Sequence, residues 1–222
     1  MSDLFRTGKS KRTSGGFTVS AAGGADLVKR LQKLENGGKV AIQRTVSDFA
    51  TRAPAWVSKG VRAHYNVDAA TVQEAVKRPK RGKNATTLKV AGITVDGAAL
   101  EYKGRLLTPT HFKMKPAERP PGNKKYKVSA AITKSGKRKQ LHSQAFLGRA
   151  SKREDAKTIP WQRVGDGRLP VHVIKAISVP QMTGGLGGDG KEHKSLAHES
   201  IKKELDQGLS KRFDNHIKRA MK

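Results

Sequence analysis

The stretch from Gly167 to Met182 is the most informative part of this chain, and it reads as one strand bracketed by two prolines, Pro170 and Pro180. Between them the side chains alternate as in a strand, where every second residue points to the same face of a sheet. A proline in mid-strand removes a backbone donor, so Pro170 and Pro180 can lie only at the ends. The pattern predicts a strand over residues 169–179 that closes a sheet. One face would carry Val171, Val173 and Lys175, and the other His172, Ile174 and Ala176.

Helical spacing of apolar residues dominates the first third of the chain. It predicts a helix over residues 25–35, which the glycines after Asn36 should end. A longer helix follows, with a kink or break expected at Pro54. Asp68 is expected to cap a short third helix that contains Val72 and Val76. The apolar stripe of the longer helix consists of Ile42, Val46, Phe49, Ala50, Ala53 and Val57.

From Thr86 onward the pattern is extended. Residues 115–125 hold three prolines and predict a long loop, and residues 135–137 predict a turn. The strand over residues 126–133 should turn Tyr126, Val128, Ala130 and Ile132 inward. The predicted strands of this part cover residues 86–91, 93–95, 111–114, 126–133, 141–148 and 159–164.

The predicted fold class is α+β: N-terminal helices, a meandering and mostly antiparallel β-sheet, and a long C-terminal helix. A basic arm over residues 1–16 is expected to become ordered only against a partner. The other predicted units are an α+β domain over residues 17–182, a glycine-rich linker over 183–194 and the C-terminal helix over 195–222.

The net charge of +28 arises from 46 Lys and Arg against 18 Asp and Glu. So many positively charged side chains repel one another in a compact monomer, so an anionic partner is expected. A membrane is the weakest candidate, because no run of about 18 apolar residues is present. The N-terminal residues lack the apolar centre of a secretory signal. With no cysteine, disulfides and thiolate metal sites are excluded. The 11 aromatic residues are scattered, which argues against a base-stacking platform.

A basic run over residues 77–83 contains proline and glycine and predicts a loop. It is either a solvated connector or a contact to phosphate or an acidic neighbour, since five positive charges in seven residues repel one another when unpaired. Loops 115–125 and 134–139 are also basic. The candidate contacts to DNA or to an acidic partner are Lys77, Arg78, Lys80, Arg81, Lys83, Lys124, Lys125, Lys137, Arg138 and Lys139.

The last helix is expected over residues 195–221, with an apolar residue at every fourth position. At about 100° per residue this stripe winds around the helix, so a single flat groove cannot cover it. It packs either within the same domain or partly against a neighbouring subunit. The candidate residues of a subunit or neck interface are Arg6, Lys9, Lys11, Arg12, Leu205, Leu209, Phe213 and Ile217.

Patterns typical of catalysis are incomplete. Residues 185–191 match the first seven positions of a phosphate-binding loop, but Glu192 replaces the hydroxyl that holds magnesium, so a flexible hinge is favoured. His193 and His198 are five positions apart, which places them on different helix faces. Acidic residues are spread out, and no nucleophile motif is present. The sequence therefore predicts a protein that is not an enzyme, with no catalytic residues, metal site or cofactor.

The segment Gly167-Arg168-Leu169-Pro170-Val171, followed at a fixed distance by Ser178-Val179-Pro180-Gln181-Met182, resembles the closing motif of the prophage minor tail protein Z family. The resemblance covers roughly residues 25–222, including the order of elements. Members usually carry Gly-Pro before the serine, where this chain has Ala176-Ile177. The insert at 115–125 and the arm at 1–16 are specific to this chain.

The resemblance implies a structural phage virion protein, a tail-completion or minor tail protein assembled in the host cytoplasm. Such proteins form a homo-oligomeric ring at the head-proximal end of the tail. Their partners are the tail terminator and other neck proteins, here with double-stranded DNA in the channel as a further candidate and no membrane. The alternative is a free nucleic-acid-binding protein without sequence preference. A nuclease that needs magnesium or manganese is a more distant third.

Overall fold

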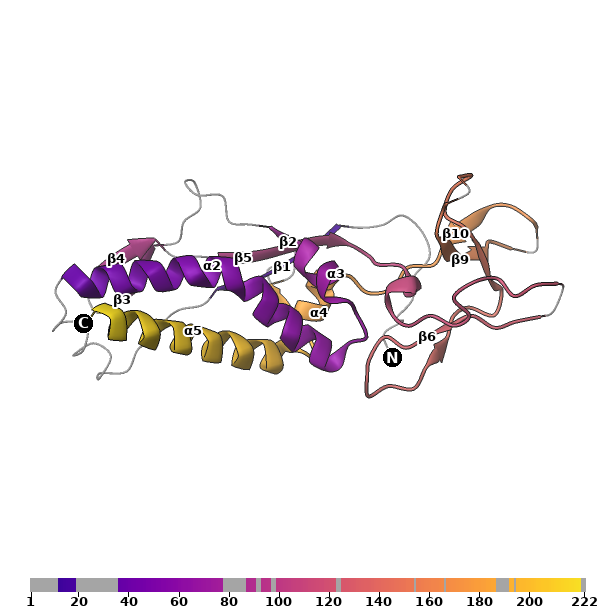
Figure 1. Ribbon diagram of the computed structural model, residues 1–222. Helices are drawn as coiled ribbons and strands as arrows, with labels where there is room; N and C mark the ends of the chain where they lie inside the picture. The colour runs from indigo at the N-terminus through magenta and orange to yellow at the C-terminus, as the bar shows by residue number, and fades with distance from the viewer. Residues whose placement is uncertain are drawn as a thin grey trace.

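The computed structural model has an α+β fold, as the sequence predicts. It describes residues 12–18, 36–77, 87–90, 93–96, 99–122, 125–153, 155–165, 167–186, 192–193 and 195–220. Figure 1 shows two long helices, α2 (Asn36–His64) and α5 (His198–Ala220), side by side at one end of the molecule. Strands lie both along this helix pair and at the other end of the molecule (Figure 1), and every strand pairing of the described residues is antiparallel.

Helix α2 (Asn36–His64) is continuous through Pro54, so the predicted break is absent. The ribbon of α2 does change direction along its length (Figure 1), as a kink at a proline would require. Asn36 and the glycines after it lie in the first turn of this helix. The helix predicted over residues 25–35 lies outside the described residues. The buried stripe of α2 consists of Ala41, Ile42, Thr45, Phe49, Ala53, Val57 and Val61.

Helix α3 (Ala69–Glu74) begins after Asp68, as predicted. Asp68 has the extended backbone of an N-cap, but its side chain makes no capping hydrogen bond. Val76 does not belong to this helix. It lies in β2 (Val76–Lys77), which pairs with β5.

The first sheet has the strand order β1-β5-β2, with β5 (Ala99–Arg105) at its centre. Its edge strand β1 (Arg12–Thr18) pairs with the whole length of β5. The prediction of a free arm over residues 1–16 is therefore wrong for residues 12–16, and the expected domain boundary falls inside β1. Residues 1–11 lie outside the described residues. The predicted strands near residues 86–95 are confirmed as a hairpin of β3 (Thr87–Val90) and β4 (Ile93–Asp96).

Residues 109–177 form a second unit, which we call the β module. It contains the 3-10 turn η1 (Pro109–His111), the hairpin of β6 (Ser129–Ala130) and β7 (Lys139–Gln140), and a sheet of order β10-β9-β8. The sheet strands are β8 (Ala145–Arg149), β9 (Thr158–Arg163) and β10 (Val171–Val173).

Three strand predictions for the β module need correction. Residues 111–114 form the end of η1 and an irregular segment instead of a strand. The predicted strand 126–133 is reduced to β6, although Val128, Ala130 and Ile132 are buried and Tyr126 is half-buried, as the inward alternation requires. The predicted strand 169–179 ends at Val173.

The strand ends early because residues 178–183 start a helix. Ser178 caps α4 (Val179–Thr183): its hydroxyl accepts from the Gln181 backbone, and the Gln181 side chain accepts from the Ser178 backbone. This capping box satisfies two otherwise unpaired donors, and Pro180 fits the first turn, where no intrahelical bond is lost. Pro180 therefore belongs to a helix start, not to a strand end.

The predicted linker 183–194 also contains structure, because β11 (Gly185–Leu186) pairs with β12 (Glu192–His193). Helix α5 (His198–Ala220) confirms the predicted last helix and packs antiparallel against α2. One core runs from this helix pair into the β module, with Val57 and Ile201 at one end and Phe112 and Leu147 at the other. No helix in the described parts of the chain is both long and apolar enough to cross a membrane.

Candidate polyanion-binding surface

Backbone hydrogen bonds fix the loops of the β module. Lys115 and Ser129 exchange two bonds of 2.8 Å, and Leu141 N donates to Val128 O over 2.8 Å. The Tyr126 hydroxyl accepts from Leu147 N at 2.9 Å, which joins the 125–133 segment to the sheet. These bonds hold side chains that a structureless loop would leave mobile.

Arg138 ties two basic loops together. Its guanidinium donates to the Lys113 carbonyl over 2.6 Å and, more weakly, to the Ser129 carbonyl over 3.5 Å. Lys113 has a φ of 48°, in the left-handed region that costs an L-residue about 1 kcal/mol or more. One member of the predicted contact set therefore holds an unfavourable backbone turn in place.

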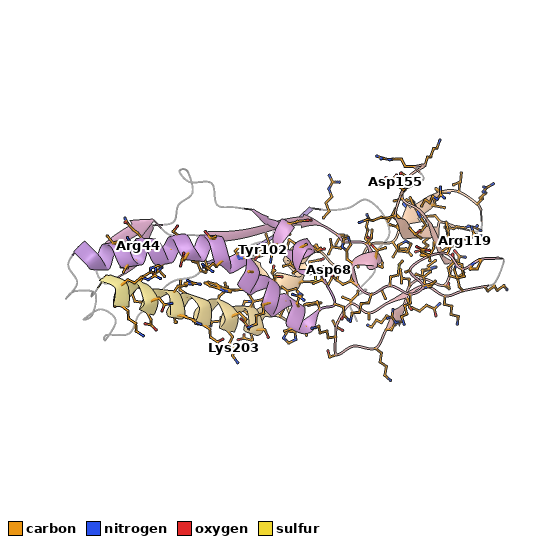
Figure 2. The ribbon with its side chains drawn as sticks, in the orientation of Figure 1. Arg44, Asp68, Tyr102, Arg119, Asp155 and Lys203 are labelled. Carbon is orange, nitrogen blue, oxygen red and sulfur yellow. The ribbon has the colours of Figure 1, made fainter. Side chains whose placement is uncertain are left out.

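Exposed positive side chains cover the β module. Figure 2 shows Arg119 and Asp155 at this end of the molecule, among many side chains with nitrogen tips. Exposed acidic side chains of the described residues here are Glu118 and Asp155 alone, and Arg153 pairs with Asp155 over 3.2 Å. The exposed basic residues are Lys113, Lys115, Arg119, Lys125, Lys127, Lys134, Lys137, Arg138, Lys139, Arg149, Lys152, Arg153, Lys157, Arg163 and Arg168.

The structure describes half of the predicted contact set. Lys125, Lys137, Arg138 and Lys139 are exposed on the β module. Lys77 lies elsewhere, in β2, opposite Glu101 of β5. The predicted contacts Arg78, Lys80, Arg81, Lys83 and Lys124 lie outside the described residues.

The predicted interface set needs a correction on α5. Leu205 and Ile217 are 2% and 5% exposed, because the chain itself covers them, so neither side chain is open to a neighbour. Leu209 and Phe213 are half-buried. Of the basic residues in this set, Arg12 lies in β1 opposite Arg105, while Arg6, Lys9 and Lys11 fall outside the described residues.

Two acidic residues of the helix pair, Asp48 and Glu204, connect α2 to α5. Asp48 accepts from His216 Nε2 at 3.2 Å and lies 3.7 Å from a nitrogen of Arg212. Lys59 pairs with Glu204 at 2.8 Å. Within the described ranges, no three His, Asp or Glu side chains come together as a potential metal site.

The structure also brings together two aromatic residues that sequence reasoning left scattered. Phe146 of β8 lies directly opposite Trp161 of β9. Both are half-buried, while their neighbours Leu147 and Pro160 on the other face are buried. The sequence contains a signal for this pairing, because a hairpin that turns in the polar stretch after Arg149 places Phe146 opposite Trp161.

His111 connects the β module to α3 and should make stability depend on pH. Its Nδ1 lies 3.4 Å from the Thr71 hydroxyl. Desolvation by burial lowers the pKa of His111 below its usual value of 6.5, more than nearby Asp68 raises it, and Lys157 lowers it further. The unfolded chain therefore binds this proton more readily than the folded chain does.

We expect this part of the free energy of unfolding to be complete above pH 6.5 and to be lost as the pH falls through the folded pKa. A His111→Gln variant should lack this component. The free energy of unfolding of wild type minus that of the variant should therefore decrease as the pH falls. Urea unfolding at a series of pH values measures it. A difference that does not change with pH would contradict the assignment to His111.

Comparison of the chain with models of known protein families, with curated proteins and with solved structures finds no match in any of the three.

Proposed function

We propose that this chain is a structural virion protein of the tail-completion type, which forms a ring at the head-proximal end of a phage tail. The observation that carries the proposal is the concentration of exposed Lys and Arg on the β module, with Glu118 and Asp155 as the exposed acidic residues described there. Such a surface is stabilised by a polyanion or by acidic neck proteins, such as the tail terminator.

A ring would multiply this surface. Identical subunits around one axis bring their β modules to the same level. Duplex DNA presents about one negative charge per 1.7 Å of its axis, so a ring of cationic surfaces opposes a matching density of charge. The closed helix pair at the other end of the subunit would then act as scaffold, since its apolar stripe is largely buried within the chain.

Ring formation and incorporation test the proposal. We expect the purified chain to form rings in electron micrographs, and we expect lysates without it to accumulate heads and tails that do not join. A variant lacking residues 1–11 keeps β1 whole and should still fold, but we expect weaker incorporation into tails if the arm reaches a neighbour. A chain that stays monomeric at all concentrations and is absent from purified particles would overturn the proposal.

The same charge supports a second candidate, a free nucleic-acid-binding protein. It predicts a monomer in size-exclusion chromatography that binds DNA with strong salt dependence. Addition of magnesium or manganese to plasmid DNA tests the nuclease alternative in the same preparation.

A further inference from the structure

The outward face of the β8-β9-β10 sheet is an apolar surface outside the core. Phe146 and Trp161 face each other across β8 and β9, and Val173 of β10 lies opposite Trp161. All three side chains are half-buried. None belongs to the core cluster or to the half-buried residues packed against it. The sheet therefore has a second apolar face in addition to the one that covers the core.

Gly148 makes room for the two aromatic rings. A Cβ at this position would lie 3.1 Å from Cδ1 and 3.2 Å from Nε1 of Trp161, and 3.8 Å from Cε2 of Phe146. Both rings thus border the same glycine. Because Gly148 has no side chain, none of its atoms separates the two rings.

Positive charge lies at both ends of this aromatic surface. The guanidinium carbon of Arg163 is 5.5 Å from the centre of the Phe146 ring, a cation–π distance. The loop from β8 to β9 carries exposed Lys152 and Lys157, and the loop from β9 to β10 carries exposed Arg168. The six residues of β9 separate the loops by about 20 Å.

We propose that this face binds single-stranded nucleic acid, with a base stacked on Trp161 and phosphates held by the two basic loops and by Arg163, whose guanidinium lies over the Phe146 ring. Bases offer their flat faces to aromatic side chains only when they are not stacked within a duplex. A second copy of this chain is disfavoured as the occupant of this face, because a symmetric contact would place Arg163 and the two basic loops against their own copies.

Tryptophan fluorescence gives a direct test, because the chain contains two tryptophans. In a Trp56→Phe background Trp161 is the remaining indole. We expect oligo(dT) to quench its emission, as stacking requires. In the same background Trp161→Leu should lower the affinity for oligo(dT) about 5- to 100-fold, measured by anisotropy of a labelled oligonucleotide, and Trp161→Phe should largely preserve it.

An abasic oligonucleotide of the same length is the matched ligand, because it keeps the phosphates and lacks the bases. The unmodified protein should bind it at least about 5-fold more weakly than oligo(dT), a measurement that needs no variant to fold. Equal affinity for the two ligands, with no quenching of Trp161, would overturn the proposal and leave ordinary phosphate binding. Loss of self-association in Trp161→Leu, with unchanged oligo(dT) affinity, would also overturn it and assign the face to contacts between copies.

Discussion

Gly60→Ala is expected to destabilise the protein by about 3 kcal/mol, although alanine is the better helix former by about 1 kcal/mol. A Cβ on Gly60 would lie 2.8 Å from Cα and 2.9 Å from the backbone nitrogen of Ile201. Backbone atoms cannot move aside as a flexible side chain can, so α2 and α5 would have to separate. Thermal and urea unfolding, followed by circular dichroism, measure the loss.

Two substitutions on α5 serve as controls. Gly208→Ala would place a Cβ 2.6 Å from ring atoms of Trp56, a half-buried side chain that can rotate, so a smaller loss is expected. Ser210→Ala lies at an exposed position and should change stability by about 0.5 kcal/mol or less. If Gly60→Ala proved neutral or stabilising, the close approach of the two helices would be wrong.

The second large effect is expected from removing charge on the β module. Replacing Lys125, Lys127, Lys137 and Lys139 with glutamine leaves Arg138 to hold its turn. Each lost phosphate contact lowers the slope of log affinity against log salt by about 0.9, so the slope for duplex DNA should fall by up to about 4. At low salt the affinity should drop about 100-fold or more. Fluorescence anisotropy at several salt concentrations measures both quantities.

A matched variant separates position from total charge. Lys202, Lys203, Lys211 and Lys218 are exposed on α5, so replacing them with glutamine removes the same charge from the helical end. This variant should keep most of the affinity and of the salt slope. Equal losses in both variants would show that overall charge governs binding, and the β module would not be a distinct surface.

The sequence predicted the helices best, because their signals are local. The helical spacing of apolar residues located α2 and α5, and the strands of the β3–β4 hairpin followed from their extended pattern. Pro54 misled the prediction in one respect. A proline lowers the stability of a helix at one position, whereas seven buried residues along α2 stabilise it by packing. The packing outweighs the local loss, so the helix continues through Pro54.

Features that depend on distant partners were missed. Strand β1 looks like a basic arm in the sequence, and only its pairing with β5 gives it structure. The opposition of Phe146 and Trp161 likewise requires the register of a hairpin. The start of α4 was missed for a different reason, since Ser178 and Gln181 are a local capping signal that the alternation of the preceding strand obscured.

The helix pair has a consequence for synthesis of the chain. Asp48 and His216 contact each other across 168 positions, and His64 reaches Ser200 across 136. While the ribosome is still translating the β module, α5 has not yet been made and cannot cover the apolar stripe of α2. Newly made chains should therefore depend on a holding chaperone until translation passes α5, and pulse-labelled nascent chains should resist protease at the helical end only afterwards.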